Sequence, residues 1–256
     1  MKPPAFDVNQ SRGAQNVSGV VHMQFNFKRY EKKYLVTHKQ AAAVTAALLK
    51  HMTLDEYGTY WVQNIYMDTD NWDVINKSLE KPLYKEKMRL RCYGIPDETS
   101  NIFLELKKKF AGVVYKRRMA FSLEALKHPL REVLSKEDQQ IAKELDFYLK
   151  GNPVDEKMFI AFRRTAYTGV ENPGLRVTFD NDVRYRCCNL DFTSPEHGRQ
   201  VLHENYQLME IKTPISIPLW LSRALSENGI YRTSYSKYGT CFTDYCAQKG
   251  DVKLYA

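Results

Sequence analysis

The stretch 84-YKEKMRLRCYG-94 alternates charged and apolar side chains, and this alternation decides the fold. Residues two apart lie on the same face of a β-strand. In the middle of this strand, one face therefore carries the cations Lys87, Arg89 and Arg91, and the other carries the apolar side chains Met88, Leu90 and Cys92. The segment predicts a strand that buries one face in a core and presents a basic face on the other side.

The same division recurs in the segments 102-IFLELKKK-109, 175-LRVTFD-180 and 208-LMEIK-212. The cations on the charged faces are Arg29, Lys33, Lys87, Arg89, Arg91, Lys107, Lys109, Lys116, Arg118, Arg164, Arg176, Lys212 and Lys237, and the acids are Glu31, Glu105, Asp180 and Glu210. The plainer interpretation is that each charged face points to water, as one face of an antiparallel sheet often does. A solvated face normally mixes both signs, however. Like charges this dense favour a bound anion.

Composition points the same way. The chain has 256 residues, 43% of them hydrophobic, and its 38 Lys and Arg against 30 Asp and Glu give a net charge of +8. Such a balance favours an anionic partner, either a phosphate polymer, a nucleic acid or an acidic lipid. The five cysteines form no C-x-x-C pair, and neither a signal segment nor a long apolar run is present. We therefore expect a reduced, cytoplasmic protein.

The chain is expected to contain a flexible N-terminal extension over residues 1–21 and one domain over residues 22–256. Strand patterns cover residues 23–36, 59–68, 84–94, 101–110, 113–123, 158–169, 174–187 and 206–213. Helices are predicted over 38–52, where Thr37 and Gln40 form a capping box, over 135–149, and after Pro218 up to Gly229. These elements predict an α+β fold.

The segments 29-RYEKKYLV-36, 102-IFLELKKK-109, 163-RRTAY-167, 175-LRVTFD-180, 208-LMEIK-212 and 234-SYSKYG-239, in this order, resemble the VTC domain. This is the polyphosphate polymerase domain of the triphosphate tunnel metalloenzyme superfamily, and the chain is similar to its bacterial members. The resemblance implies a closed eight-stranded antiparallel β-barrel, the triphosphate tunnel, with helices packed on its outside.

The resemblance also implies roles for individual residues. It assigns catalytic contacts with triphosphate to Lys33, Arg89, Arg91, Lys107, Arg118, Arg164, Arg176 and Lys237. It assigns Glu210 to a metal ion, Mn²⁺ or Mg²⁺, with Lys212 beside it, and Ser236 to phosphate. The face pattern adds Arg29, Lys87, Lys109 and Lys116 as substrate-binding residues. Ser234 and Phe162 depart from some eukaryotic members, which carry a lysine and a tyrosine there.

The expected function is transfer of the γ-phosphate of ATP to a growing inorganic polyphosphate chain. The attacking phosphate oxygen is already ionised, so positioning and charge stabilisation suffice without a strong base. A triphosphatase or a non-catalytic polyphosphate-binding tunnel is the first alternative. A single-stranded nucleic-acid-binding module is the second, because 58-GTYWVQNIY-66 supplies aromatic residues for stacking. The sequence is compatible with a separate membrane subunit as a partner. It leaves the oligomeric state open.

Overall fold

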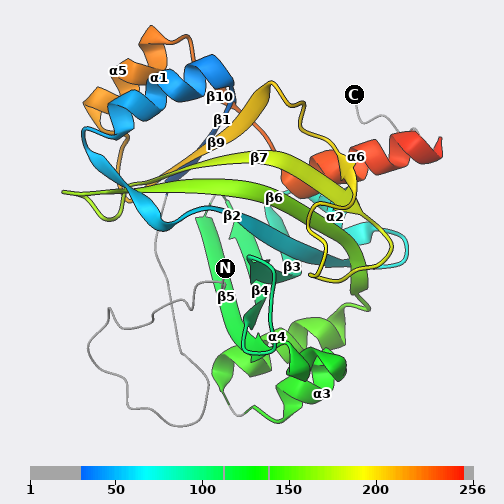
Figure 1. Cartoon of the computed structure of the whole chain (residues 1–256). Helices are drawn as coiled ribbons and strands as arrows, with labels where there is room; N and C mark the ends of the chain where they lie inside the picture. Colours follow the sequence, from blue (N-terminus) through cyan, green and yellow to red (C-terminus); the bar gives the residue numbers. More distant parts are fainter. Residues whose placement is uncertain (1–29, 112, 138, 251–256) are drawn as a thin grey trace. The chain divides into compact units, whose positions relative to one another are not determined.

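The computed structural model describes residues 30–111, 113–137 and 139–250 (Figure 1). The strands are β1 Tyr30–Thr37, β2 Met52–Asp68, β3 Tyr84–Tyr93, β4 Asn101–Phe110, β5 Val113–Ser122, β6 Asp155–Gly169, β7 Arg176–Arg186, β8 Arg199–Gln200, β9 Tyr206–Thr213 and β10 Arg232–Thr233. The helices are α1 His38–Leu48, α2 Asp73–Leu79, the 3-10 turn η1 Glu124–Lys127, α3 Leu130–Ser135, α4 Gln140–Gly151, α5 Leu219–Glu227 and α6 Lys237–Lys249. The predicted extension over residues 1–21 and Arg29 lie outside the described residues.

The α+β class is confirmed, and the eight predicted strands correspond to β1–β7 and β9. Closure of the sheet into the expected eight-stranded barrel stays a prediction, because hydrogen bonds do not close the sheet among the described strands. The hydrogen-bonded order is β10-β1-β9-β7-β6-β2-β3-β4-β5, with β8 on β7, and among the described strands it does not return to its start. The two additional strands, β8 and β10, are only two residues long, too short for any alternation to predict them.

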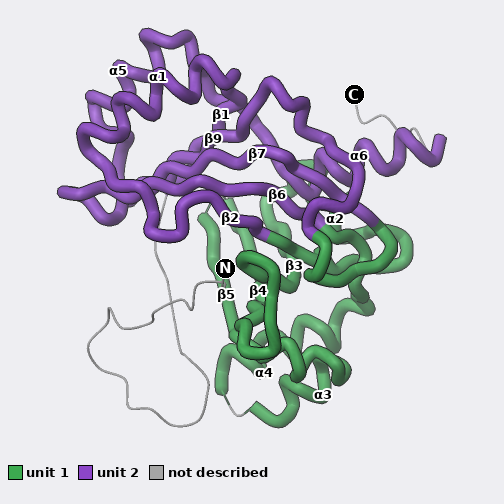
Figure 2. The backbone as a smooth tube through the Cα atoms, in the orientation of Figure 1, with its two compact units in different colours: residues 1–26, 63–159, 187–194 green, residues 27–62, 160–186, 195–256 purple. Residues whose placement is uncertain are grey.

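The chain forms two compact units (Figure 2). Among the described residues, unit 1 contains 63–111, 113–137, 139–159 and 187–194. Unit 2 contains, among the described residues, 30–62, 160–186 and 195–250. Strands β2 and β6 begin in one unit and end in the other, so each contributes side chains to both.

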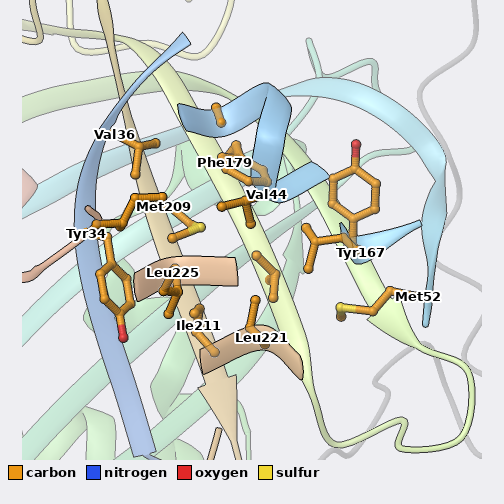
Figure 3. Packing of buried hydrophobic residues seen from close by; sticks show 14 of the residues in the cluster. Tyr34, Val36, Val44, Met52, Tyr167, Phe179, Met209, Ile211, Leu221 and Leu225 are labelled. Carbon is orange, nitrogen blue, oxygen red and sulfur yellow. The ribbon is translucent and has the colours of Figure 1, made fainter. Parts of the chain in front are cut away.

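The core of unit 2 lies between the helices α1 and α5 and one face of its strands (Figure 3). Val44 of α1 and Leu221 of α5 are fully buried against Met209 and Ile211 of β9. The predicted capping box is confirmed, because Thr37 Oγ1 accepts from the Gln40 amide at 3.3 Å and Gln40 Oε1 accepts from the Thr37 amide at 3.0 Å. Because apolar and charged residues alternate along β1, β7 and β9, the charged face of these strands points away from this core.

Unit 1 is built on the antiparallel ladder β3–β4–β5. Its apolar face is fully buried and consists of Met88, Leu90, Cys92, Ile102, Leu104 and Leu106. Helix α4 contacts β5, and Arg117 of β5 donates to Glu144 of α4 at 2.7 Å. The charged faces predicted by parity in these strands therefore lie opposite a real core.

Helix α6 is the longest element that the sequence pattern did not predict. Ser236 caps it, since its hydroxyl accepts from the Gly239 amide at 3.2 Å, and Gly250 ends it at φ 75°. Its buried residues Tyr238, Cys241 and Phe242 have helical spacing, a signal masked by the polar residues between them. None of the described helices combines the length and apolarity needed to cross a bilayer.

Candidate functional site

The charged face of unit 2 is centred on Glu210 of β9. Strand β9 lies between β1 and β7, so Glu210 is directly opposite Lys33 on one side and Thr178 on the other. The Glu210 carboxylate is buried and has three cations around it: Lys212 Nζ at 3.0 Å, Lys33 Nζ at 3.4 Å and Arg164 Nη2 at 3.8 Å. One carboxylate thus organises cations from three strands.

Asp180 of β7 is a second, fully buried carboxylate on the same face. Arg164 of β6 donates from Nε to Oδ1 at 2.6 Å and from Nη2 to Oδ2 at 2.7 Å. Lys237, the first residue of α6, donates to Oδ2 at 2.5 Å. Both cations also lie over the Phe162 ring, at 5.1 Å for Arg164 and 4.3 Å for Lys237. Asp180 and Phe162 therefore fix the two cations between them.

Burial and the neighbouring cations set the ionisation of these carboxylates. Burial disfavours the charged form of Glu210, but Lys212, Lys33 and other cations outweigh it and hold its pKa well below the ordinary value. Burial also opposes ionisation of Asp180, yet Arg164 and Lys237 lower its pKa. The pKa of Lys237 is lowered by its own burial, which Asp180 only partly offsets. The face therefore presents ionised carboxylates and a lysine that loses its proton more easily than usual.

The residues of unit 2 suit a divalent ion that is shared with phosphate. Glu210 and Asp180 offer carboxylate oxygens, the hard ligands that Mg²⁺ and Mn²⁺ prefer. Across the described part of the chain, no three His, Cys, Asp or Glu side chains gather into a metal-binding group. Mg²⁺ commonly takes only one or two carboxylates and completes its shell with water and substrate phosphates. Glu210 fits that role better than it fits a protein-only metal cage.

Unit 1 repeats the arrangement around Glu105 of β4. Glu105 lies directly opposite Arg89 of β3 and Arg118 of β5, and its side chain is 1% exposed. Arg89 donates to Oε2 from Nε at 2.9 Å and from Nη2 at 2.7 Å. Arg118 Nε donates to Oε1 at 2.6 Å, Lys116 Nζ lies 2.6 Å from the same oxygen, and Arg91 Nε is 3.9 Å from Oε2. Four cations surround one carboxylate.

Aromatic side chains hold these guanidinium groups in place. Tyr66 accepts from Arg89 Nη1 at 2.8 Å, Tyr93 accepts from Arg118 Nη2 at 2.9 Å, and the Arg118 guanidinium lies 4.4 Å from the centre of the Phe103 ring. Cation–π contact and hydrogen bonding together restrict the rotamers of an arginine. Arg89 and Arg118 are therefore held in fixed orientations by the protein itself.

Two groups of the Glu105 cluster titrate near neutrality. Burial tends to raise the pKa of Tyr93, but Arg91 and Arg118 outweigh it and lower that pKa to about 7. Burial lowers the pKa of Lys116 to about 7 in spite of the nearby Glu105 carboxylate. Burial opposes ionisation of Glu105 itself, yet its cations hold its pKa well below the ordinary value. The charge of this cluster therefore depends on pH around 7.

The remaining predicted residues lie around these two clusters. Lys107 is directly opposite Lys87 and Lys116, and Lys109 is opposite Lys85. Arg176 is opposite Lys212 in register, but its guanidinium pairs with Asp55 of β2 at 3.0 Å. The Ser236 hydroxyl caps α6, one residue before Lys237.

Five residues of the two clusters have no site role predicted from the sequence, namely Glu105, Asp180, Tyr93, Phe103 and Phe162. Parity already placed Glu105 and Asp180 on the charged faces, so a single carboxylate on a mainly cationic face was a usable signal. Tyr93 follows Arg91 by two residues and shares its face, which was a weaker signal. Nothing in the sequence linked Asp55 to Arg176, because 121 residues separate them.

The family model of the VTC domain matches residues 28–244. Among solved structures, the chain is similar to a putative adenylyl cyclase from Hippeastrum, described as having a dominant triphosphatase activity, with 16% identity, a TM-score of 0.51, and coverage of 85% of this chain and 96% of that one. The PH1819 protein from Pyrococcus horikoshii OT3 has 13% identity, a TM-score of 0.45, and coverage of 86% and 99%. No curated protein matches this chain.

Proposed function

This chain belongs to the VTC domain family, and on that premise we propose that it transfers the γ-phosphate of ATP to an inorganic polyphosphate chain. The observation that carries the proposal is the cation surplus around each buried carboxylate. Glu105 alone has four cations within 4 Å, of which it can neutralise one. Buried like charges repel strongly unless an anion compensates them. A triphosphate supplies several negative charges at once.

The transfer needs little from the protein beyond positioning and charge stabilisation. A terminal oxygen of polyphosphate attacks the γ-phosphorus of ATP, the bond from that phosphorus to the β–γ bridging oxygen breaks, and ADP leaves. The chain becomes one phosphate longer. Guanidinium groups held in fixed orientation, such as Arg89 and Arg118, suit the non-bridging oxygens of the transferred group. A Mn²⁺ or Mg²⁺ ion at Glu210 would neutralise phosphate charge when bound.

Triphosphate hydrolysis is the second candidate, and a specific observation favours it. Burial tends to raise the pKa of Tyr93, but the neighbouring arginines outweigh it and lower that pKa to about 7. Burial itself lowers the pKa of Lys116 to about 7. A group with such a pKa can accept a proton from an attacking water at neutral pH. The triphosphatase activity described for the Hippeastrum protein agrees with this candidate but comes from a distant relative.

The closed tunnel and the single domain over residues 22–256 belong to the same proposal. In the family, the tunnel is formed by strands whose charged faces turn inward. The inward direction is supported here by the buried apolar faces of β3, β4, β7 and β9, because each of these strands has its cations on the opposite side.

The test is incubation of the purified chain with ATP, Mn²⁺ and a short polyphosphate primer. We expect ADP and a ladder of acid-insoluble phosphate that an exopolyphosphatase degrades. Lys33→Ala and Lys237→Ala should each suppress the ladder, because each removes a cation held at Glu210 or Asp180. Lys39→Ala is the matched control, since Lys39 is exposed on α1.

The products distinguish the candidates. Release of free phosphate in proportion to ATP, with no ladder under Mn²⁺ or Mg²⁺, would identify a triphosphatase. Binding of triphosphate without turnover would identify a polyphosphate-binding protein. Equal thermal stabilisation by triphosphate and by single-stranded DNA would instead favour the nucleic-acid-binding module.

A further inference from the structure

Helix α4 of unit 1 has a large apolar side chain on its outer side. Phe147 is 78% exposed, although the same helix buries Leu145 completely. Gln140, Lys143, Glu144 and Phe147 have the spacing i, i+3, i+4 and i+7, so they lie along one face of the helix. We call these four residues the α4 stripe. A phenyl ring in such a stripe is a contact residue without a contact inside the described part of unit 1.

The sheet next to the stripe exposes aromatic rings as well. Helix α4 contacts β5 (Figure 1). Lys108 of β4 lies directly opposite Tyr115 of β5, and Phe110 shares the face of Lys108 because the two are two residues apart. Tyr115 is 46% exposed and Phe110 is 51% exposed. Exposed apolar patches of several residues mark interaction sites, and aromatic residues are enriched there.

A hollow of about 440 Å³ lies beside the stripe and is lined by Lys108 together with all four stripe residues. A cavity of about 150 Å³ is enough to bind a benzene ring, so this hollow has room for a phenyl side chain and its neighbours. Phe147 stands exposed at the edge of the hollow. A protruding ring and a hollow that accepts a ring therefore belong to one patch, which is the self-complementarity that a two-fold dimer interface requires.

The charges around the hollow have both signs. Arg117 Nε donates to Glu144 at 2.7 Å, and Lys108 pairs with Glu86 at 3.3 Å. A polyanion at this patch would meet the two carboxylates as well as the cations, so the patch does not suit phosphate or nucleic acid. Lys143 and Glu144 are adjacent and opposite in sign. An antiparallel copy of α4 therefore presents a carboxylate to each lysine and a lysine to each carboxylate.

We propose that the α4 stripe and its hollow bind a second copy of this chain, with the two α4 helices antiparallel across a two-fold axis. The axis passes between Lys143 and Glu144, so each Lys143 meets Glu144 of the second copy. Each Phe147 then enters the hollow of the second copy beside Gln140. A contact this small gives a weak dimer that depends on concentration. The interface lies on the face of β4 opposite Glu105, so it is separate from the proposed reaction.

Sedimentation velocity over a concentration series measures the dimer directly. The wild type should shift from monomer to dimer as the protein concentration rises into the high micromolar range. F147D should raise the dissociation constant of the dimer by about tenfold or more, because a carboxylate replaces a ring buried in the hollow. Y231D is the matched control, since Tyr231 of unit 2 is 81% exposed and lies outside the patch. A wild type that stays monomeric, or an equal loss in both variants, would overturn the proposed interface.

Charge reversal tests the antiparallel arrangement of the helices. K143E places two carboxylates together twice in the dimer, and E144K places two ammonium groups together twice, so each variant alone should dimerise at least about fivefold more weakly. An equal mixture of the two variants should recover dimerisation, because every pair in the mixed dimer joins opposite charges. K39E reverses an exposed charge on α1 and is the control. An equal loss in K39E, or no recovery in the mixture, would overturn the antiparallel pairing.

Melting curves separate these effects from folding defects. E144K also removes the partner of Arg117, so F147D and K143E, which change exposed side chains, decide the test if E144K does not fold. Tripolyphosphate should raise the melting temperature of F147D as much as that of the wild type. Loss of this rise in F147D alone would show that the patch belongs to the phosphate site, and would overturn a separate interface. Absence of the rise in both proteins would count against the proposed function and leave the interface standing.

Discussion

The ammonium group of Lys237 lies 2.5 Å from Oδ2 of Asp180, although 57 residues separate the two in sequence. The same carboxylate accepts two hydrogen bonds from Arg164. Asp180 of β7 therefore forms ion pairs both with the first residue of α6 and with a residue of β6. Since both cations are expected to contact phosphate, Asp180 is a positioning residue of the proposed site.

Asp180→Asn should reduce phosphoryl transfer about 100-fold, because a small misplacement of positioning groups has an effect of that size. The change also removes the anion that supports protonation of Lys237, so the pKa of Lys237, already lowered by burial, should fall further. The activity optimum should then move to lower pH, where Lys237 is protonated again. A pH–rate profile measures this. An unshifted optimum would contradict the role of Asp180. The control is Asp244→Asn, which affects a partly exposed carboxylate that pairs with Arg199 and accepts from the Tyr185 hydroxyl.

Glu105→Gln should destabilise the protein by about 3–5 kcal/mol, because it leaves buried cations without their carboxylate. Urea unfolding measures the loss. Tripolyphosphate should restore more stability to the variant than it adds to the wild type, since an anion replaces the missing charge. Glu144→Gln breaks only a half-exposed pair with Arg117 and should cost less than about 1 kcal/mol. A loss as small in Glu105→Gln would refute the central role of this carboxylate.

Glu210→Gln should reduce metal-dependent turnover by about 100-fold, while the chain still folds. The glutamine keeps the size of the side chain but binds a divalent ion poorly. A Mn²⁺ titration of activity, together with a circular dichroism spectrum, checks this. Glu227→Gln on the exposed surface of α5 should behave as wild type. Full activity of Glu210→Gln at ordinary Mn²⁺ concentrations would remove Glu210 from the metal site.

Polyphosphate affinity should fall as pH rises from about 6 to about 8, because the Glu105 cluster loses positive charge when Tyr93 or Lys116 releases a proton. Stability should change in the opposite direction. Burial tends to raise the pKa of Tyr93, but Arg91 and Arg118 outweigh it and lower that pKa from 10.0 to about 7. Between these two pH values the unfolded chain binds more protons than the folded chain does. The contribution of Tyr93 to the free energy of unfolding therefore rises with pH in this range. Below about pH 7 this contribution is lost.

Tyr93→Phe tests the pH dependence directly. The variant should show a flatter decline of polyphosphate affinity across neutral pH, and stability that rises less between pH 7 and pH 10. Titration calorimetry and urea unfolding at several pH values provide both measurements. Tyr115→Phe is the control, because Tyr115 lies on the opposite face of β5. Identical profiles for Tyr93→Phe and the wild type would show that Tyr93 does not titrate in this range.

The strand alternation was enough to predict much of this fold. Strands β4 and β9 have the predicted bounds, and the capping box of α1 is present as predicted. Period-2 patterns are local, and burial of one face reinforces them. The short strands β8 and β10 escaped prediction because two residues contain no period, and α6 escaped because its apolar positions are few.

Sequence by itself determined which side chains share a face, since backbone geometry alone fixes the alternation of a strand. Alternation alone thereby separates the basic residues from the core. Only the tertiary structure decided which strands are neighbours. Register placed Glu105 between Arg89 and Arg118, and Lys85 opposite Lys109. Pairings such as Asp180 with Lys237 depend on contacts between residues distant in the chain, and no local pattern encodes them.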